Sequence, residues 1–251
     1  MKRALPWLIP AMLIALWQAA AMLGLLSAQV LPAPTEVAAA GWHLACSGTL
    51  WSNIEISAWR ALIGFVIGGG IGFALGIVNG LSPVSETLTD STLQMLRNIP
   101  HLALIPLVIL WFGIGEEAKV FLIALGVFFP IYLNTYHGIR TVEPGLKEMG
   151  RVYGLGRWAL FTQVIFPGAL PSIMVGVRFA LGSMWLTLIA AEALAAESGI
   201  GYMTTTAREF MQTDIVVVGT LLYALLGKSA DVITKAMERR LLRWHPTYQR
   251  Q

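Results

Sequence analysis

The stretch of sequence that decides the fold is RTVEPGLKEMGRVYGLGRWALFTQVIFP, residues 140–167. It is a polar connection between two long apolar segments, and it carries four of the chain's basic residues together with Gly154 and Pro167. Connections between helices are mostly about 2–8 residues long, so a charged connection of this length needs a purpose beyond joining two segments. The stretch therefore predicts a helical element that docks against a soluble partner.

The rest of the chain has the composition of a membrane protein. Of its 251 residues, 56% are hydrophobic and 12% are charged, whereas a soluble domain carries about 25% charged residues. The net charge of +3, without a basic run, argues against nucleic acid as a partner. Cys46 is the single cysteine and the four histidines are scattered, so the sequence predicts neither an internal disulfide nor a metal site.

Six segments approach the roughly 20 residues that a helix needs to cross the hydrocarbon core of a bilayer. They lie near residues 7–26, 59–81, 92–112, 119–137, 169–194 and 214–234. The third is interrupted by Pro100 and Pro106, which transmembrane helices tolerate where neighbouring groups satisfy the freed carbonyls. We therefore expect an all-α polytopic membrane protein with six transmembrane helices.

The first span has the features of a signal peptide, because Lys2 and Arg3 precede the apolar run of residues 4–26. However, the run is long enough to cross a bilayer and further spans follow it. We therefore expect it to be retained as a transmembrane helix.

Basic residues set the expected orientation, since loops rich in lysine and arginine stay in the cytoplasm. With the N-terminus inside, three basic residues, Arg60, Lys119 and Arg208, fall outside. Twelve fall in cytoplasmic segments: Lys2, Arg3, Arg97, Arg140, Lys147, Arg151, Arg157, Lys235, Arg239, Arg240, Arg243 and Arg250. This bias predicts that both termini and residues 140–167 are cytoplasmic.

The second span carries glycine at every fourth position. This glycine stripe consists of Gly64, Gly68, Gly72, Gly76 and Gly80. Such spacing places the glycines along one helix face, where they allow another backbone to approach closely. The approaching helix belongs either to the same chain or to a second subunit, and in both cases the span is part of a tightly packed bundle.

Arg178 and Glu192 are charged residues within the fifth span, where a charge is costly and should face a polar cavity or a partner. One interpretation places Arg178 in an anion pathway. The other makes it a structural charge held by carbonyl groups of a broken helix, such as the one containing Pro100. Glu192, and Asn98 and His101 beside that proline, complete the set of pathway candidates.

Nothing in the sequence predicts an enzyme. Gly227-Lys228-Ser229 looks like the end of a phosphate-binding loop, but Leu222 stands where that motif needs a glycine. Lys228 and Asp231, three residues apart, are instead expected to pair on one helix face. H-E-x-x-H and G-x-S-x-G motifs do not occur. We therefore expect no catalytic residue, metal or cofactor in this chain.

The polar stretch of residues 140–167 divides at Gly154. After Pro144, a favourable first-turn residue, Leu146, Met149 and Val152 or Tyr153 recur at helical spacing, and Gly154 suits a helix stop. A second apolar stripe ends at Pro167 and consists of Trp158, Phe161, Val164 and Ile165. We expect two short helices around a glycine turn, with the stripes packed and the charges in water.

At these residues the chain resembles the membrane subunits of ATP-binding-cassette importers, whose cytoplasmic loop carries the motif E-A-A-x3-G-x9-I-x-L-P. The spacing is the same here: Glu148-Met149-Gly150, three residues, Gly154, nine residues, then Val164-Ile165-Phe166-Pro167. Met149 and Gly150 replace the two alanines, and Val164 and Phe166 replace isoleucine and leucine. The resemblance implies a loop that docks onto an ATPase through Glu148, Met149, Gly150, Gly154, Val164, Phe166 and Pro167.

Other stretches narrow the resemblance. Residues 97–115, RNIPHLALIPLVILWFGIG, are similar to the third span of the nitrate, taurine and sulfonate branch of this family. Residues 167–192 and 213–228 are most similar to aliphatic sulfonate permeases. The resemblance therefore implies import of aliphatic sulfonates, and the same machine carrying taurine, nitrate or another small anion is the alternative.

The resemblance also implies an assembly. It would be a homodimer of this type-1 permease fold in a bacterial inner membrane, with two cytoplasmic ATPase subunits that bind ATP and magnesium. A periplasmic binding protein would deliver the substrate. Residues 1–56 would hold the first helix and a periplasmic loop, 57–240 the transmembrane domain, and 241–251 a cytoplasmic tail.

A self-sufficient carrier or channel is the alternative from a different class. Such a protein would need no ATPase-docking loop, and carriers often show two inverted halves. The sequence shows the loop and no convincing internal repeat, which favours the importer subunit.

Overall fold

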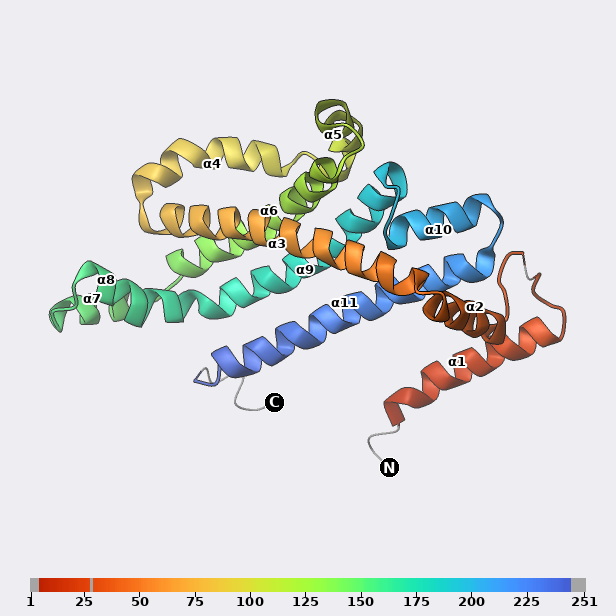
Figure 1. Ribbon diagram of the computed structural model, residues 1–251. Coiled ribbons are helices and arrows are strands. Elements are labelled where there is room, and N and C mark those ends of the chain that lie inside the picture. The colour runs from red at the N-terminus through yellow and green to blue at the C-terminus, as the bar shows by residue number, and fades with distance from the viewer. Residues whose placement is uncertain (1–4, 28, 245–251) are drawn as a thin grey trace. The chain divides into compact units, whose positions relative to one another are not determined.

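The computed structural model describes residues 5–27 and 29–244 of the chain, and every regular element within them is a helix (Figure 1). In chain order the elements are α1 (Leu5–Met22), α2 (Pro34–Cys46), α3 (Thr49–Leu81), α4 (Pro83–Arg97), η1 (His101–Leu104), α5 (Ile105–Phe112), α6 (Glu116–Arg140), α7 (Pro144–Val152), α8 (Arg157–Leu160), η2 (Phe161–Ile165), α9 (Phe166–Ala195), α10 (Ile200–Glu209) and α11 (Thr213–Leu241). The chain forms two compact units. Unit 1 comprises Met1–Ala58 and Glu192–Leu225, and unit 2 comprises Trp59–Ala191 and Leu226–Gln251.

Four helical segments of the described chain are long and apolar enough to cross a membrane. They are Thr49–Leu81, Glu116–Arg140, Arg157–Leu194 and Thr213–Leu241, and they coincide with four of the six expected spans. A bent pair of helices supplies a fifth, and α1 contributes the shorter apolar helix Leu8–Met22. The described residues therefore carry four spans, or five with the bent pair, where the sequence predicts six.

The third expected span, residues 92–112, is not one helix. α4 starts at Pro83 and ends at Arg97, and the helical segment that follows from His101 to Phe112 is bent by 78° against it. The break has a local cause, because Pro100 disfavours helical backbone at the preceding residue and has no N–H to donate. α4 also begins at Pro83, well before residue 92. Hydropathy does not reveal this start, because the first half of the helix is polar.

Pro167 does not end a second short helix, contrary to the prediction from sequence. α8, the π turn η2 and α9 continue as one helical segment, Arg157–Leu194. Within η2 the Phe166 N–H donates to the Phe161 carbonyl, five residues back. The hydrogen-bond ladder thus changes register just before the proline, which sits in the first turn of α9, where a missing N–H is tolerated.

The glycine stripe of α3 faces α6 within unit 2. A Cβ added at Gly68 would lie 2.1 Å from the carbonyl oxygen of Ala124, and one at Gly72 would lie 2.6 Å from that of Phe128. The two backbones therefore approach more closely than side chains would allow. A buried apolar cluster from α3, α6 and α9 continues this contact and consists of Ala61, Ile123, Val127, Ile131, Ala180, Met184 and Leu188.

Unit 1 contains two helices that the sequence analysis does not predict, α2 and α10. α2 packs beside α1, and its Val37 forms a small buried cluster with Leu50 and Val218. α10 follows Gly199, whose φ of 105° is a conformation that glycine adopts readily. Both helices are too short for hydropathy to mark them as spans.

Candidate functional site

The segment that the sequence predicts to dock, residues 144–167 (called the docking segment below), begins with α7 (Figure 1). Its chain turns at Gly154. Gly154 has φ 78°, the left-handed conformation that suits glycine. The Leu155 N–H donates to the Gly150 carbonyl at 3.0 Å, and the Gly154 N–H donates to the Arg151 carbonyl at 2.9 Å. This pair of bonds is a Schellman motif. The predicted helix stop at Gly154 is therefore confirmed.

The apolar stripe of α7 is exposed, although its helical spacing predicts that it packs. Val152 is 86% exposed, Tyr153 is 80% exposed, and Trp158 at the start of α8 is 76% exposed. The inner part of the second stripe does pack, since Ile165 is buried and Phe161 lies against the same cluster in unit 2. An exposed apolar patch on a charged surface is typical of a protein–protein contact.

The inner side of the docking segment is tightly packed. A Cβ at the buried Gly150 would lie 2.7 Å from the Leu160 side chain, so the alanine of the family motif would need that leucine to shift. Lys147 Nζ donates to the Ile139 carbonyl at 3.3 Å. Burial, followed by repulsion from Arg140 and Arg151, holds the pKa of Lys147 below its ordinary value.

The motif residues of this segment divide by exposure. Glu148 and Met149 are exposed and Gly150 is buried, while Val164, Phe166 and Pro167 are half-buried. The exposed members lie on α7, and the covered members anchor the segment to unit 2.

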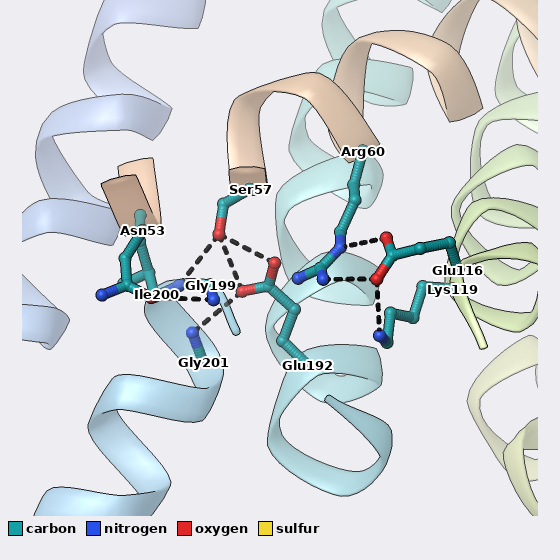
Figure 2. A network of polar contacts seen from close by, with 9 residues as sticks. All are labelled: Asn53, Ser57, Arg60, Glu116, Lys119, Glu192, Gly199, Ile200 and Gly201. Atoms are coloured by element: carbon teal, nitrogen blue, oxygen red, sulfur yellow. Dashed lines mark hydrogen bonds and ion pairs between the residues drawn. The ribbon is translucent and has the colours of Figure 1, made fainter. Parts of the chain in front are cut away.

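Glu192 lies in unit 1 as a buried acceptor (Figure 2). Its carboxylate accepts from Ser57 Oγ at 2.7 and 2.9 Å and from the Gly201 N–H at 2.9 Å. Ser57 Oγ accepts from the Ile200 N–H at 2.9 Å, and Asn53 Oδ1 accepts from the Gly199 N–H at 2.8 Å. Side chains from α3 and α9 therefore satisfy the free N–H groups at the start of α10. This arrangement makes Glu192 a capping group for that helix.

A second polar cluster lies within unit 2 (Figure 2). The Glu116 carboxylate accepts from Arg60 Nε and Nη2, both at 2.6 Å, and from Lys119 Nζ at 2.9 Å. Arg60 and Lys119 are buried, although the count of basic residues places both on the outer side of the membrane. Glu116 supplies the negative charge that the two buried cations need. The Glu116–Lys119 ion pair is predictable from sequence, because the two residues are three apart on one helix.

Arg178 has a carboxylate partner in unit 2. Its guanidinium lies 2.6 Å from Glu238 Oε2, and the Glu238 side chain is buried. If Arg178 is a structural charge, the sequence predicts that backbone carbonyl groups hold it. The structure shows the Glu238 carboxylate as its partner instead, and sequence reasoning does not find this residue. Lys228 and Asp231 pair at 3.7 Å, as their spacing predicts.

His101 and Asn98 both lie at the break after α4. Asn98 is the exposed residue that follows the helix, and His101 Nε2 lies 3.0 Å from Thr187 Oγ1 of α9. His101 also lines a cavity of about 330 Å³ in unit 2, together with Arg97 and Ser183. The positive-inside count takes Arg97 as a cytoplasmic residue, but this cavity places it beside the middle of α6.

In the described part of the chain, no group of three or more histidine, cysteine, aspartate or glutamate side chains comes together to hold a metal ion. The candidate site is made up of residues 144–167 and the polar groups described above.

Comparison with known proteins identifies the family to which the chain belongs. Residues 64–243 match the family described as "Binding-protein-dependent transport system inner membrane component". The chain belongs to this family. This inner membrane component is a multi-pass transport permease rather than a catalytic subunit. The family description names a binding protein on which the transport depends.

Relatives of this inner membrane component match nearly its whole length. It is 61% identical over 246 residues to SsuC of Escherichia coli (strain K12), named as an aliphatic sulfonates transport permease protein, covering 98% of this chain and 94% of that protein. It is 45% identical to SsuC of Bacillus subtilis (strain 168), covering 96% and 88%. The taurine transport system permease protein TauC of Escherichia coli (strain K12) is 35% identical, covering 94% and 87%.

Solved structures share the fold of this inner membrane component. A crystal structure of an amino acid ABC transporter with histidines matches with a TM-score of 0.64 and 16% identity, covering 79% of this chain and 96% of that one. An inward-facing MetNI methionine ABC transporter matches with a TM-score of 0.53 and 19% identity, covering 75% and 94%. At these identities the likeness supports the permease fold alone.

Proposed function

We propose that this permease moves aliphatic sulfonates across the inner membrane after a periplasmic binding protein delivers them. The observation that carries the proposal is 61% identity over 98% of the chain to a relative named for aliphatic sulfonate transport. A second relative with that name, from Bacillus subtilis (strain 168), is 45% identical.

Sequence identity supports the choice of cargo less directly than it supports the transporter family. Relatives at 35% and 34% identity are named for taurine and for riboflavin transport, so at that level the family fold does not fix the substrate. The higher identity to the relatives named for aliphatic sulfonates, 61% and 45% against 35%, favours that cargo over taurine.

The proposed assembly contains two copies of this chain and two ATPase subunits, with ATP and magnesium bound by the ATPases. Support comes from the docking segment, whose exposed apolar residues suit a protein partner. Six spans with both termini in the cytoplasm would place that segment on the ATPase side. α1 would supply the sixth span, beyond the five that length and hydropathy give.

The proposed domain arrangement follows from the same assembly. Residues 57–240 would form the transmembrane domain, in keeping with the family match at residues 64–243. Residues 1–56 would contribute the first helix and a periplasmic loop, and 241–251 a cytoplasmic tail, of which residues 245–251 lie outside the described part.

The proposed mechanism is rigid-body coupling between two global states. ATP would draw the ATPase subunits together, and the docked segment would carry that movement into the membrane. Arg178 and Glu192 are held by Glu238 and by Ser57 and Gly201. We therefore assign these two charges to holding helices in place rather than to contacting the cargo.

The test is ATP hydrolysis by the purified complex of this permease with its ATPase and binding protein in lipid nanodiscs. We expect binding protein loaded with an alkanesulfonate to stimulate hydrolysis, and taurine or nitrate to have little effect. Stimulation by taurine alone would reassign the cargo. Failure of any ATPase to co-purify would contradict the docking assignment and reopen the self-sufficient carrier.

A further inference from the structure

The break after α4 opens a cavity of about 330 Å³ within unit 2. Its volume lies in the range of small-molecule sites, about 300–1,000 Å³. Most of its lining is apolar, including Leu93 and Leu96 of α4 and Leu125, Phe128 and Phe129 of α6. Arg97, His101 and Ser183 supply the polar groups. A cavity of this composition suits a ligand with a hydrocarbon body and one polar end.

Arg97 is the residue whose position most needs explanation. It shares this cavity with Leu125 and Phe129, which lie about 14–20 Å along α6 at 1.5 Å per residue. α6 is one of the membrane-spanning candidates, so Arg97, an exposed residue at the end of α4, borders a cavity beside the middle of a span. Within residues 5–27 and 29–244, no carboxylate forms an ion pair with it. An arginine at that level requires an anionic partner.

The contact with Thr187 defines which ring nitrogen of His101 carries the hydrogen. Thr187 Oγ1 donates its one proton to the Ser183 carbonyl at 2.8 Å, so in its 3.0 Å contact with His101 Nε2 it accepts. Nε2 therefore carries a hydrogen, which it donates to Thr187, and Nδ1 of the neutral ring is an acceptor. Arg97 and Ser183 are the donors of the lining that remain for an acidic head. The Thr187 hydroxyl is held on both sides, which fixes the imidazole beside the cavity.

Gly126 creates the space at this point. A Cβ there would lie 2.6 Å from Thr187 Oγ1, 3.3 Å from Ser183 Oγ and 3.4 Å from His101 Nε2. Any side chain at position 126 would therefore fill the polar end of the cavity. The cluster is open because this residue is glycine.

We propose that this cavity binds an aliphatic organic anion inside the permease, with its acidic head at Arg97 and its hydrocarbon chain along the α4 and α6 side chains. His101 and Ser183 lie beside the head, and Phe128 and Phe129 lie beside the chain. The inference rests on the proposed function, because it names the place where the cargo pauses between the binding protein and the cytoplasm.

A second cavity, of about 400 Å³ in unit 1, does not compete for this role. The residues described around it are apolar, from α1, α2, α3 and α11, and include Ile14, Trp17 and Leu222. No charged side chain of the described chain lines it, so it offers an acidic head no counter-charge.

The first test measures ligand binding by the permease–ATPase complex in nanodiscs without binding protein, using ethanesulfonate, propanesulfonate and pentanesulfonate with 1-pentanol as the uncharged comparison. Empty nanodiscs correct for partition into lipid. We expect binding to tighten about fourfold for each added methylene and 1-pentanol to bind far more weakly. Equal affinity for all chain lengths would overturn the proposal.

The second test replaces the charge. Arg97→Gln should weaken pentanesulfonate binding by about tenfold to a hundredfold, as expected for loss of a hydrogen-bonded charge. Arg240→Gln, at an exposed arginine of α11 outside the cavity, is the matched control and should bind normally. Unchanged binding by Arg97→Gln would overturn the assignment of the acidic head to Arg97.

A third variant tests the cavity without removing charge. Leu96 is 48% exposed, so Leu96→Trp should fold and fill the apolar end, and pentanesulfonate should lose more affinity than ethanesulfonate. Leu88→Trp, on the same helix but outside the lining, should change neither. Equal losses for both ligands in Leu96→Trp would contradict an alkyl-binding role.

The two proposals fail in different ways. If loaded binding protein stimulates ATP hydrolysis but the permease alone binds no sulfonate, the importer assignment stands and the internal site is wrong. If sulfonate binds with the expected dependence on Arg97 but the binding protein gives no stimulation, the site stands and the delivery route is wrong.

Discussion

Glu192 is a carboxylate that is only 1% exposed, and such a group is tolerated inside a protein only where donors surround it. The Ser57 hydroxyl and the Gly201 N–H meet it within unit 1. The Gly201 N–H is also one of the free groups at the start of α10. A single side chain thus stabilises its own buried charge and the first turn of a helix.

Glu192→Ala should therefore destabilise α10. Two buried donors would lose their acceptor, which costs about 1–3 kcal/mol for each group left unpaired. We expect a lower thermal midpoint and faster amide hydrogen exchange at Gly201. Glu197→Ala, at an exposed glutamate nearby, is the control. Wild-type exchange at Gly201 in Glu192→Ala would contradict the capping role.

At the scale of elements, the contact between α3 and α6 depends on the absence of side chains on one face. Gly68→Ala should destabilise unit 2 by about 1–3 kcal/mol, the usual cost of overpacking, because its Cβ would lie 2.1 Å from a backbone carbonyl. The measurement is the thermal midpoint of the permease in detergent.

Gly70 provides the matched control on the same helix. An added Cβ at Gly70 meets nothing within 4 Å, so Gly70→Ala should be neutral or stabilising by up to about 1 kcal/mol from helix propensity. Equal midpoints for the two variants would show that the close approach of α3 and α6 does not limit stability.

The same scale shows which elements sequence can predict. Hydropathy locates α3, α6, α9 and α11, because each is apolar over a whole bilayer thickness. It misses the first half of α4, before residue 92, because that part is too polar to be recognised as a span. The π turn before Pro167 also escapes prediction, since it depends on the hydrogen-bond register rather than on composition.

The candidate site residues also fall into two groups, those that local sequence predicts and those that only the fold reveals. The helix stop at Gly154 is predictable because turn and motif depend on local spacing. The partners of Arg178 and Glu192 are distant in sequence, and only the fold brings Glu238 and Ser57 to them. Arg97 lies inside the expected span of residues 92–112. Its position in the sequence therefore indicates a charge within the membrane.

At the scale of the whole molecule, the docking segment is continuous with a span. α8, η2 and α9 form one helical segment of 38 residues, Arg157–Leu194. Movement imposed on the segment by a partner would therefore pass along a helix rather than through a flexible loop. Gly154 is the turn that sets the angle between α7 and this helix.

Gly154→Val tests whether transport depends on that turn. The Cβ would meet nothing within 4 Å, so the effect comes from backbone strain alone, about 1–2 kcal/mol for an L-residue in the left-handed conformation. We expect the variant to insert in the membrane but to retain less ATPase on purification and to transport less sulfonate into proteoliposomes. Gly156→Val is the control, because Gly156 has φ −65° and open space around it. Full ATPase retention and full transport by Gly154→Val would show that the orientation of α7 is not what couples the two proteins.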